Sequence, residues 1–285
     1  MSRRILVVGF QLHDAGKTTL CKALIHGFRE AGVRLVPFKP HSGISYWNQF
    51  DIFRGALEKG RLLSSDIMEL EDAAQSGVPL EVLNPVNRLS NSVPDTGMTE
   101  EKLAFREFIA ERFTQENGVA HRSVYYLNGA LKLSRLRDME TFFVKMRRNA
   151  DRVYFIRKFE DLVQAYDSSF ERATSSCYAR IRDMPLLVES FNDAAYPYSQ
   201  AEDCDTVLCV ASNTILQLDA QRYFAAIESH AVAKPKLQLT VPHIYAPSII
   251  KATFTIQPLT AEERNETAKL TENYSEIINK ILKNT

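Results

Sequence analysis

The chain has 285 residues, of which 45% are hydrophobic and 25% charged, a composition typical of a globular protein that buries one large core or two smaller ones. Its 35 basic and 35 acidic side chains balance at pH 7, so net charge favours neither a nucleic-acid nor a membrane partner. The four cysteines (Cys21, Cys177, Cys204 and Cys209) lie far apart in the sequence, which predicts buried thiols in a reducing compartment. With no expected signal peptide or membrane span, we predict a cytoplasmic protein.

A strand, a loop and a helix are predicted within residues 5–28. Residues 5–8 are apolar and mostly β-branched, and apolar side chains recur at helical spacing over residues 20–28. Main-chain N–H groups in such a loop can bind the phosphates of a nucleoside triphosphate, a lysine adds positive charge, and a threonine hydroxyl can bind Mg²⁺. The predicted nucleotide-binding residues are Gly9, His13, Asp14, Ala15, Gly16, Lys17, Thr18 and Thr19.

This loop differs from the usual phosphate-binding pattern, G-x-x-x-x-G-K-S/T. Gln11 stands where that pattern has its first glycine, and the nearest glycine is Gly9. The alternative is a chance Gly-Lys-Thr at an ordinary helix start. The order of strand, loop and helix favours a modified nucleotide-binding loop.

A second strand is predicted over residues 33–38, ending at Lys39, with a turn over residues 41–43. Because ligands collect beyond the carboxyl ends of parallel strands, Lys39 and Ser42 are expected at the same edge as the phosphate loop. The alternative for Lys39 is a solvated side chain. Asp66 lies in the first turn of the next predicted helix, where the helix dipole alone favours a carboxylate, and it is also placed to reach a metal.

Several later segments are predicted from their patterns. Residues 45–60 carry an aromatic cluster expected in the core or in a lid, rather than as a base-stacking platform. A helix is predicted to start at Thr99 and end at Gly118, with Phe105, Ile109 and Phe113 spaced by four. The basic residues over 131–150 indicate a solvated helix face, or alternatively a patch for an anionic substrate. They are Lys132, Arg135, Arg137, Lys145, Arg147 and Arg148.

Residues 185–188 predict a buried strand that ends at Glu189. An acidic residue just after such a strand can bind Mg²⁺ beside a phosphate loop. Towards the end of the chain, residues 237–241 and 249–256 alternate in polarity, and a helix is predicted from Thr260, with Glu263 completing a capping box.

Four segments in order resemble the signature of dethiobiotin synthetase and of the related amide-forming enzymes of cobalamin synthesis, such as cobyrinic acid a,c-diamide synthase. They are Gly9 to Thr18, Lys39-Pro40-His41-Ser42-Gly43, the segment from Ser65-Asp66 to Leu70, and Val82-Leu83-Asn84-Pro85. A fifth segment from Leu186 to Pro197 resembles the family's strand, glutamate and turn, with Ser190–Asp193 in place of its glycine-rich turn.

The resemblance implies roles for particular residues. Lys17 would bind the phosphates, and Lys39 would hold the transferred phosphoryl group or the substrate carboxylate. Thr18, Asp66 and Glu189 would bind Mg²⁺. It also implies ATP as the nucleotide and a homodimer with the site near the subunit interface.

The predicted fold is an α/β, mostly parallel, doubly wound sheet of the P-loop NTPase type. Residues 1–230 would form this domain, with a helical insertion over about 98–182, and residues 231–285 would pack on it as strands and a helix. The first functional hypothesis is a Mg²⁺- and ATP-dependent enzyme that phosphorylates or ligates a small carboxylate or carbamate. Lys17, Lys39 and Glu189 would act in catalysis, and Lys39, Ser42 and the basic 131–157 region would hold the substrate.

Two alternatives remain open. One is a nucleotide-dependent switch, an ATPase or GTPase with a protein partner. The other is a pseudoenzyme, because Gln11 and the Ser190–Asp193 turn depart from the family pattern. The sequence leaves the choice between adenine and guanine open.

Overall fold

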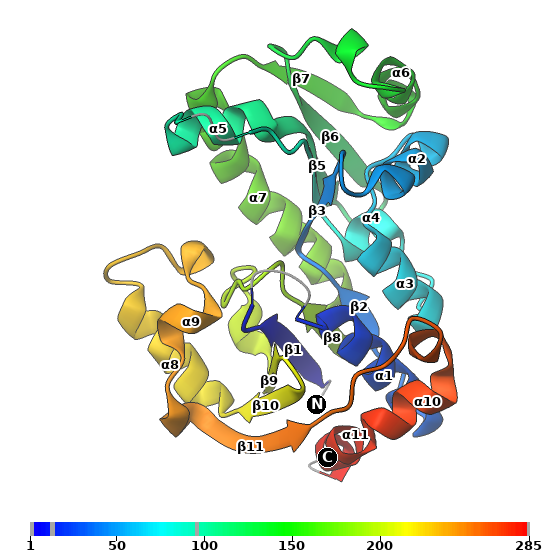
Figure 1. The fold of residues 1–285 in the computed structure, drawn as a ribbon, viewed down its shortest axis with the longest axis vertical. Coiled ribbons are helices and arrows are strands. Elements are labelled where there is room, and N and C mark those ends of the chain that lie inside the picture. Colours follow the sequence, from blue (N-terminus) through cyan, green and yellow to red (C-terminus); the bar gives the residue numbers. More distant parts are fainter. Residues whose placement is uncertain (1–2, 12–14, 95–96, 284–285) are drawn as a thin grey trace. The chain divides into compact units, whose positions relative to one another are not determined.

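The computed structural model describes residues 3–11, 15–94 and 97–283. The chain is α/β and forms two compact units, each built on its own sheet (Figure 1). The first unit comprises Met1–Pro40, Asp66–Val78 and Ile181–Thr285, and the second comprises His41–Ser65 and Pro79–Arg180.

The first unit contains a six-stranded sheet in the order β11-β10-β9-β1-β8-β2. Its strands are β1 (Arg4–Gly9), β2 (Val36–Phe38), β8 (Leu186–Glu189), β9 (Thr206–Ala211), β10 (Thr214–Leu218) and β11 (Ile250–Thr255). Strands β2, β8, β1 and β9 pair in parallel, whereas β10 and β11 join in antiparallel pairs. Strands β1 and β8 are apolar and buried along nearly their whole length, as expected where helices cover both faces of a parallel sheet.

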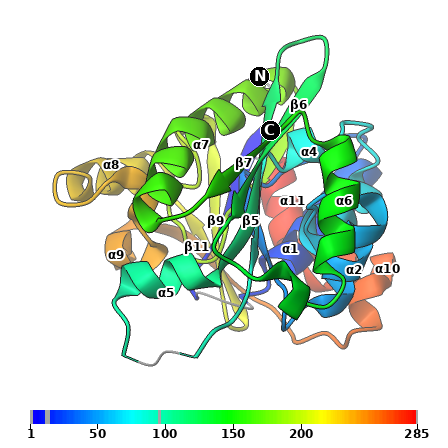
Figure 2. The same ribbon diagram turned by 90° about the horizontal axis from the view of Figure 1, so that it is seen from above.

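Helices cover both faces of this sheet (Figures 1 and 2). On one face, the core joins β1 to α1 (Lys17–Glu30), α3 (Ser65–Ala74), α10 (Thr267–Asn273) and α11 (Ser275–Lys283). The other face carries α8 (Ala220–His230) and the short α9 (Val241–Ile244). Short 3-10 turns occupy Ala201–Asp203, Lys236–Gln238, Pro247–Ile249 and Glu263–Asn265.

Residues 231–285 belong to the first unit. The reciprocal hydrogen bonds predicted between Thr260 and Glu263 are present, from the Thr260 N–H to Glu263 Oε2 at 2.9 Å and from the Glu263 N–H to Thr260 Oγ1 at 3.2 Å. They precede the 3-10 turn, however, and the helix predicted from Thr260 begins only at Thr267. The alternating run at 249–256 contains β11, but the run at 237–241 forms no strand. Its residues lie in a 3-10 turn and at the start of α9, with a single bridge from Thr240 to Ala194.

The second unit contains a five-stranded sheet in the order β3-β4-β5-β6-β7. Its strands are β3 (His41–Ser45), β4 (Val86–Ser90), β5 (Phe108–Glu116), β6 (His121–Asn128) and β7 (Arg152–Ile156). The two outer pairs, β3 with β4 and β6 with β7, are parallel, and the two inner pairs are antiparallel. Its helices are α2 (Phe50–Lys59), α4 (Leu80–Leu83), α5 (Glu100–Glu107), α6 (Met139–Asn149) and α7 (Phe159–Ile181), with a 3-10 turn at Leu133–Arg135.

Three hydrophobic clusters hold helices on this sheet. Phe53 of α2 and Phe142 of α6 pack with Ile109 and Tyr125. A second cluster joins Phe170 of α7 to the sheet, and a third joins Leu162, near the start of the same helix, to the sheet. The aromatic side chains of residues 45–60 therefore belong mainly to the core, except Trp47, which is exposed.

The structure corrects the prediction of one sheet with a helical insertion. Residues 98–182 contain β5, β6 and β7, and residues 41–43 lie in β3 rather than in a turn. The helix predicted from Thr99 ends at Glu107, because the next residues pair with β4 on one side and β6 on the other. Periodicity cannot separate a strand buried on both faces from a buried helix. Among the described residues, no helix is long and apolar enough to cross a membrane.

Candidate functional site

Two glycines flank the connection between β1 and α1, one at the end of the strand and one before the helix, and the structure favours glycine at each. Gly16 precedes α1 with φ of 88°, a left-handed conformation that favours glycine. A Cβ on Gly9 would lie 2.9 Å from Lys17 Nζ and 3.2 Å from both Ala15 Cβ and the Asn192 carbonyl oxygen. Thr18 and Thr19 follow in the first turn of α1. The predicted residues His13 and Asp14 lie outside the described residues.

Gln11, which replaces the usual first glycine, is held by a side-chain contact. Its Nε2 donates to Ser212 Oγ at 3.1 Å, and Ser212 lies in the turn between β9 and β10. Gln11, which departs from the standard pattern, thus links the loop to the β9–β10 hairpin.

Lys17 is buried beside the segment that follows β8. Its Nζ donates to the Asn192 carbonyl oxygen at 2.7 Å. Burial lowers the pKa of Lys17, an effect that the nearby Glu189 carboxylate opposes. Asn192 has φ of 48°, and asparagine is among the few residues besides glycine that adopt this conformation readily. The Ser190–Asp193 segment therefore keeps a glycine-like turn and supplies the main-chain acceptor for Lys17.

Lys39 bridges two carboxylates at the centre of the first unit. Its Nζ donates to Glu189 Oε1 at 2.5 Å and to Asp66 Oδ2 at 2.6 Å. Lys39 is 3% exposed and Glu189 2% exposed. Burial by itself lowers the pKa of Lys39, but the two carboxylates outweigh it and raise that pKa. Burial raises the pKa of Glu189, and Lys39 partly offsets that rise.

Thr18 connects the start of α1 to the same glutamate. Its hydroxyl donates to Glu189 Oε1 at 3.0 Å. The other carboxylate oxygen, Oε2, is buried and has no hydrogen-bond partner among the described residues. Because an unpaired buried acceptor is costly, this oxygen points to a missing cation or donor.

The oxygen atoms of Thr18, Asp66 and Glu189 are the hard ligands that Mg²⁺ prefers, and the unpaired Glu189 Oε2 fits that role. In the described part of the chain, no group of three or more His, Cys, Asp or Glu side chains is placed to hold a metal. Phosphate oxygens and water would have to complete the coordination, which is the usual arrangement for Mg²⁺.

Ser42 and the basic residues at 131–150 lie in the second unit. The Ser42 hydroxyl is buried, donating to Asn84 Oδ1 at 2.8 Å and accepting from Asn87 Nδ2 at 2.8 Å. Most of the basic side chains are exposed on or near α6. The structure therefore joins Lys17, Thr18, Lys39, Asp66 and Glu189 within the first unit, while Ser42 belongs to a separate buried polar network.

Replacing Gly9 with alanine is expected to reduce the stability by about 1–2 kcal/mol, because the new methyl group must push Lys17 Nζ away from the Asn192 carbonyl. The affinity for a nucleoside triphosphate is expected to fall about tenfold, which corresponds to about 1.4 kcal/mol of binding free energy. Urea unfolding and nucleotide titration measure the two effects.

Gly55→Ala is the matched control, since a Cβ at Gly55 meets no atom within 4 Å and alanine favours the helix. A Gly9→Ala protein that is as stable as the Gly55→Ala protein, and binds nucleotide as tightly, would contradict the tight packing at Gly9.

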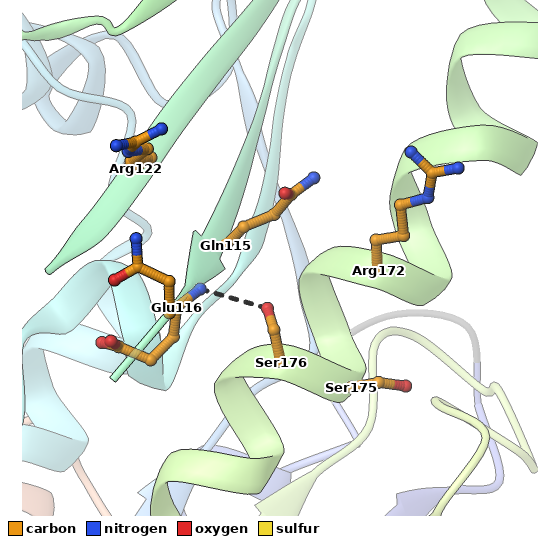
Figure 3. A pocket seen from close by; sticks show the side chains of 7 residues that line it. Gln115, Glu116, Arg122, Arg172, Ser175 and Ser176 are labelled. Carbon is orange, nitrogen blue, oxygen red and sulfur yellow. Dashed lines mark hydrogen bonds between the residues drawn. The ribbon is translucent and has the colours of Figure 1, made fainter. Parts of the chain in front are cut away.

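A pocket of about 590 Å³, lined by residues with polar side chains, lies in the second unit between the end of β5, the start of β6 and helix α7 (Figure 3). Arg122 and Arg172 line it, and the Glu116 N–H donates to Ser176 Oγ at 3.1 Å. None of the predicted site residues lines this pocket.

No protein-family model matches the chain and no curated protein matches it, so these two comparisons neither support nor correct this site.

Proposed function

We propose that the protein is a Mg²⁺- and ATP-dependent enzyme of the P-loop type that transfers a phosphoryl group to a small carboxylate or carbamate. One observation carries the proposal: Lys17, Thr18, Lys39, Asp66 and Glu189 converge beyond the carboxyl ends of the parallel strands β1, β2 and β8. This edge is where ligands bind in open α/β sheets.

Each side chain has a role that suits phosphoryl transfer, which depends on positioning and charge neutralisation. Lys17 would leave the Asn192 carbonyl to contact the phosphates. Lys39 would keep its charge at neutral pH and hold the anionic acceptor or the transferred group. Thr18, Asp66 and Glu189 would hold Mg²⁺, which neutralises phosphate charge when bound.

The test is the thermal stability of the wild type and of Lys17→Ala with Mg²⁺ and ATP, GTP, ADP or no nucleotide. A ligand at ~100 times its dissociation constant stabilises the folded state by about 2.7 kcal/mol, so ATP with Mg²⁺ should raise the melting temperature of the wild type but not of Lys17→Ala. Lys22→Ala is the matched control on the same helix, because Lys22 contacts Glu69 and Asn265 and none of the five site residues. If no nucleotide raises the melting temperature of the wild type, the proposal is wrong.

A nucleotide-dependent switch is the second candidate, and the second unit favours it. That unit has its own five-stranded sheet and three hydrophobic clusters, so it is large enough to present a surface to a partner protein. Stabilisation by GTP but not ATP, with slow hydrolysis that no small carboxylate accelerates, would favour the switch. Binding of ATP without hydrolysis under any condition would favour the pseudoenzyme.

A further inference from the structure

Strand β7 lies at the edge of the five-stranded sheet, and no other described strand covers its outer side. Among the strands of the described residues, it pairs only with β6, through a parallel ladder. Apart from that ladder, the main chain of residues 152–155 makes no hydrogen bond with any other described residue. Proteins normally cover, shorten or charge such an edge, because its unpaired N–H and C=O groups attract another strand.

Two aromatic side chains are exposed on this strand. Phe155 is 61% exposed and Tyr154 is 43% exposed, and the Tyr154 ring stacks on Tyr126 of β6 with centroids 5.3 Å apart. Figure 1 shows β7 at the edge of the sheet of the second unit. Exposed aromatic side chains on an edge strand are typical of a surface that another strand covers.

The charges that flank β7 specify which strand would fit. In an antiparallel pair of two β7 strands centred on Tyr154, Asp151 lies opposite Arg157 of the second copy, and Arg157 lies opposite its Asp151. Val153 and Phe155 lie opposite each other in the same way. Opposite charges and aromatic–β-branched pairs at facing positions each stabilise a ladder.

Neighbouring registers lack this complementarity. A shift by one residue in one direction places Arg152 opposite Arg157, and a shift by two in the same direction places Arg152 opposite Lys158. A shift by one in the other direction leaves Arg157 opposite Ala150. The sequence around β7 is therefore self-complementary in one antiparallel register.

We propose that two copies of the chain associate through β7, pairing antiparallel about a twofold axis at Tyr154, so that their five-stranded sheets become continuous. This interface is isologous, as expected for a symmetric dimer. A five-residue edge buries less area than a standard stable interface, so the dimer is expected to be weak and concentration-dependent. The inference does not depend on the proposed enzymatic activity.

A cysteine scan tests the register directly. On the twofold axis, the two Cα atoms at position 154 would lie about 4.5–5.5 Å apart, within the range that a disulfide bridges. At position 155 the two Cα atoms would be about 8 Å apart, given a rise of about 3.4 Å per residue and a strand spacing of about 4.8 Å, which is too far. The four native cysteines are buried and should contribute little background.

Tyr154→Cys is therefore expected to form a disulfide-linked dimer under mild oxidation, at least tenfold faster than Phe155→Cys. Phe155 is the more exposed position, so random collision would favour Phe155→Cys instead. Equal rates at the two positions, or no cross-linked dimer from either variant, would overturn the proposal.

Charge reversal provides an independent test by sedimentation velocity over a range of concentrations. Arg157→Asp should weaken the dimer at least tenfold, and Asp151→Arg combined with Arg157→Asp should restore it. Arg54→Asp is the control for net charge, because Arg54 is exposed on α2. A monomeric wild type at all concentrations, or a double variant no better than Arg157→Asp, would contradict the interface.

Discussion

Replacing Lys39 with methionine is expected to lower the free energy of unfolding by about 3–5 kcal/mol near neutral pH, because it leaves the buried Glu189 carboxylate without its counter-ion. The Asp66 side chain is partly exposed and can be hydrated, so the loss arises mainly at Glu189. Nucleotide hydrolysis should be lost as well if Lys39 holds the reacting group. Urea unfolding and hydrolysis assays measure the two effects.

The stability that Lys39→Met loses should depend on pH in a defined direction. Burial already raises the pKa of Glu189 above its usual 4.5, and Lys39 opposes that rise, so removing Lys39 raises the pKa further. A carboxyl group whose pKa is raised in the folded state does not destabilise the protein below its unfolded pKa. Its cost in stability grows as the pH rises towards and through its folded pKa. The deficit of Lys39→Met relative to the wild type should therefore be smaller at pH 5 than at pH 8.

Two comparisons make this prediction specific. The double variant Lys39→Met with Glu189→Gln lacks the buried charge. It should recover part of the lost stability, and most of the pH dependence of the Lys39→Met deficit should disappear. Lys22→Met changes a lysine whose ion pair is with the half-exposed Glu69 and should cost about 0–1 kcal/mol. An equal deficit for Lys39→Met at pH 5 and pH 8 would show that the Glu189 charge is not its cause.

Replacing Arg112 with alanine is expected to cost about 4 kcal/mol, because it creates a cavity and leaves several buried acceptors unpaired. Arg112 is 0% exposed in β5. Its guanidinium donates to the carbonyl oxygens of Leu62 and Asn84 at 2.9 and 2.7 Å, and to the Thr114 hydroxyl. Burial lowers the pKa of Arg112, and these contacts tie two loops of the second unit to the sheet.

Arg112→Lys should recover only part of that loss, because one ammonium group cannot reproduce the fixed fork of donors. The control is Arg122→Ala on the adjacent strand β6, an exposed arginine whose side chain makes no hydrogen bond to a described residue, for which a change within about 0.5 kcal/mol is expected. Urea unfolding followed by circular dichroism checks all three. If Arg112→Ala and Arg122→Ala proved equally stable, the buried arginine would not be essential to the second unit.

The sequence predicted well those features that depend on local patterns. The apolar strand before Gly9, the helix that begins near Lys17 and the capping box at Thr260 and Glu263 each depend on residues close together in the chain. In contrast, the helix expected through residues 108–117 is wrong, because β5 is defined by its pairing with two distant strands. The fold class is α/β, as expected, with two sheets in place of one.

In the candidate site, too, the sequence predicted the local features but not the contacts between distant residues. The sequence placed Lys39 and Glu189 just after strand ends, but only the parallel order of β1, β8 and β2 brings them within 2.5 Å. The Asn192 carbonyl was missed as the partner of Lys17, because main-chain acceptors have no sequence signature. The only available signal was an asparagine in a short polar turn, a residue type that tolerates a positive φ.

By itself, the sequence determined the α/β class, the strand–loop–helix at the start of the chain and the identity of five polar side chains with a chemistry suited to phosphates and Mg²⁺. These follow from residue type, periodicity and short spacing. Only the tertiary structure decided that the chain divides into two units, that Ser42 joins the second unit's network and that Lys39 lies between two carboxylates. Strand order and burial determine these features, because they depend on contacts between residues far apart in the chain, such as Lys39 and Glu189, which are 150 positions apart.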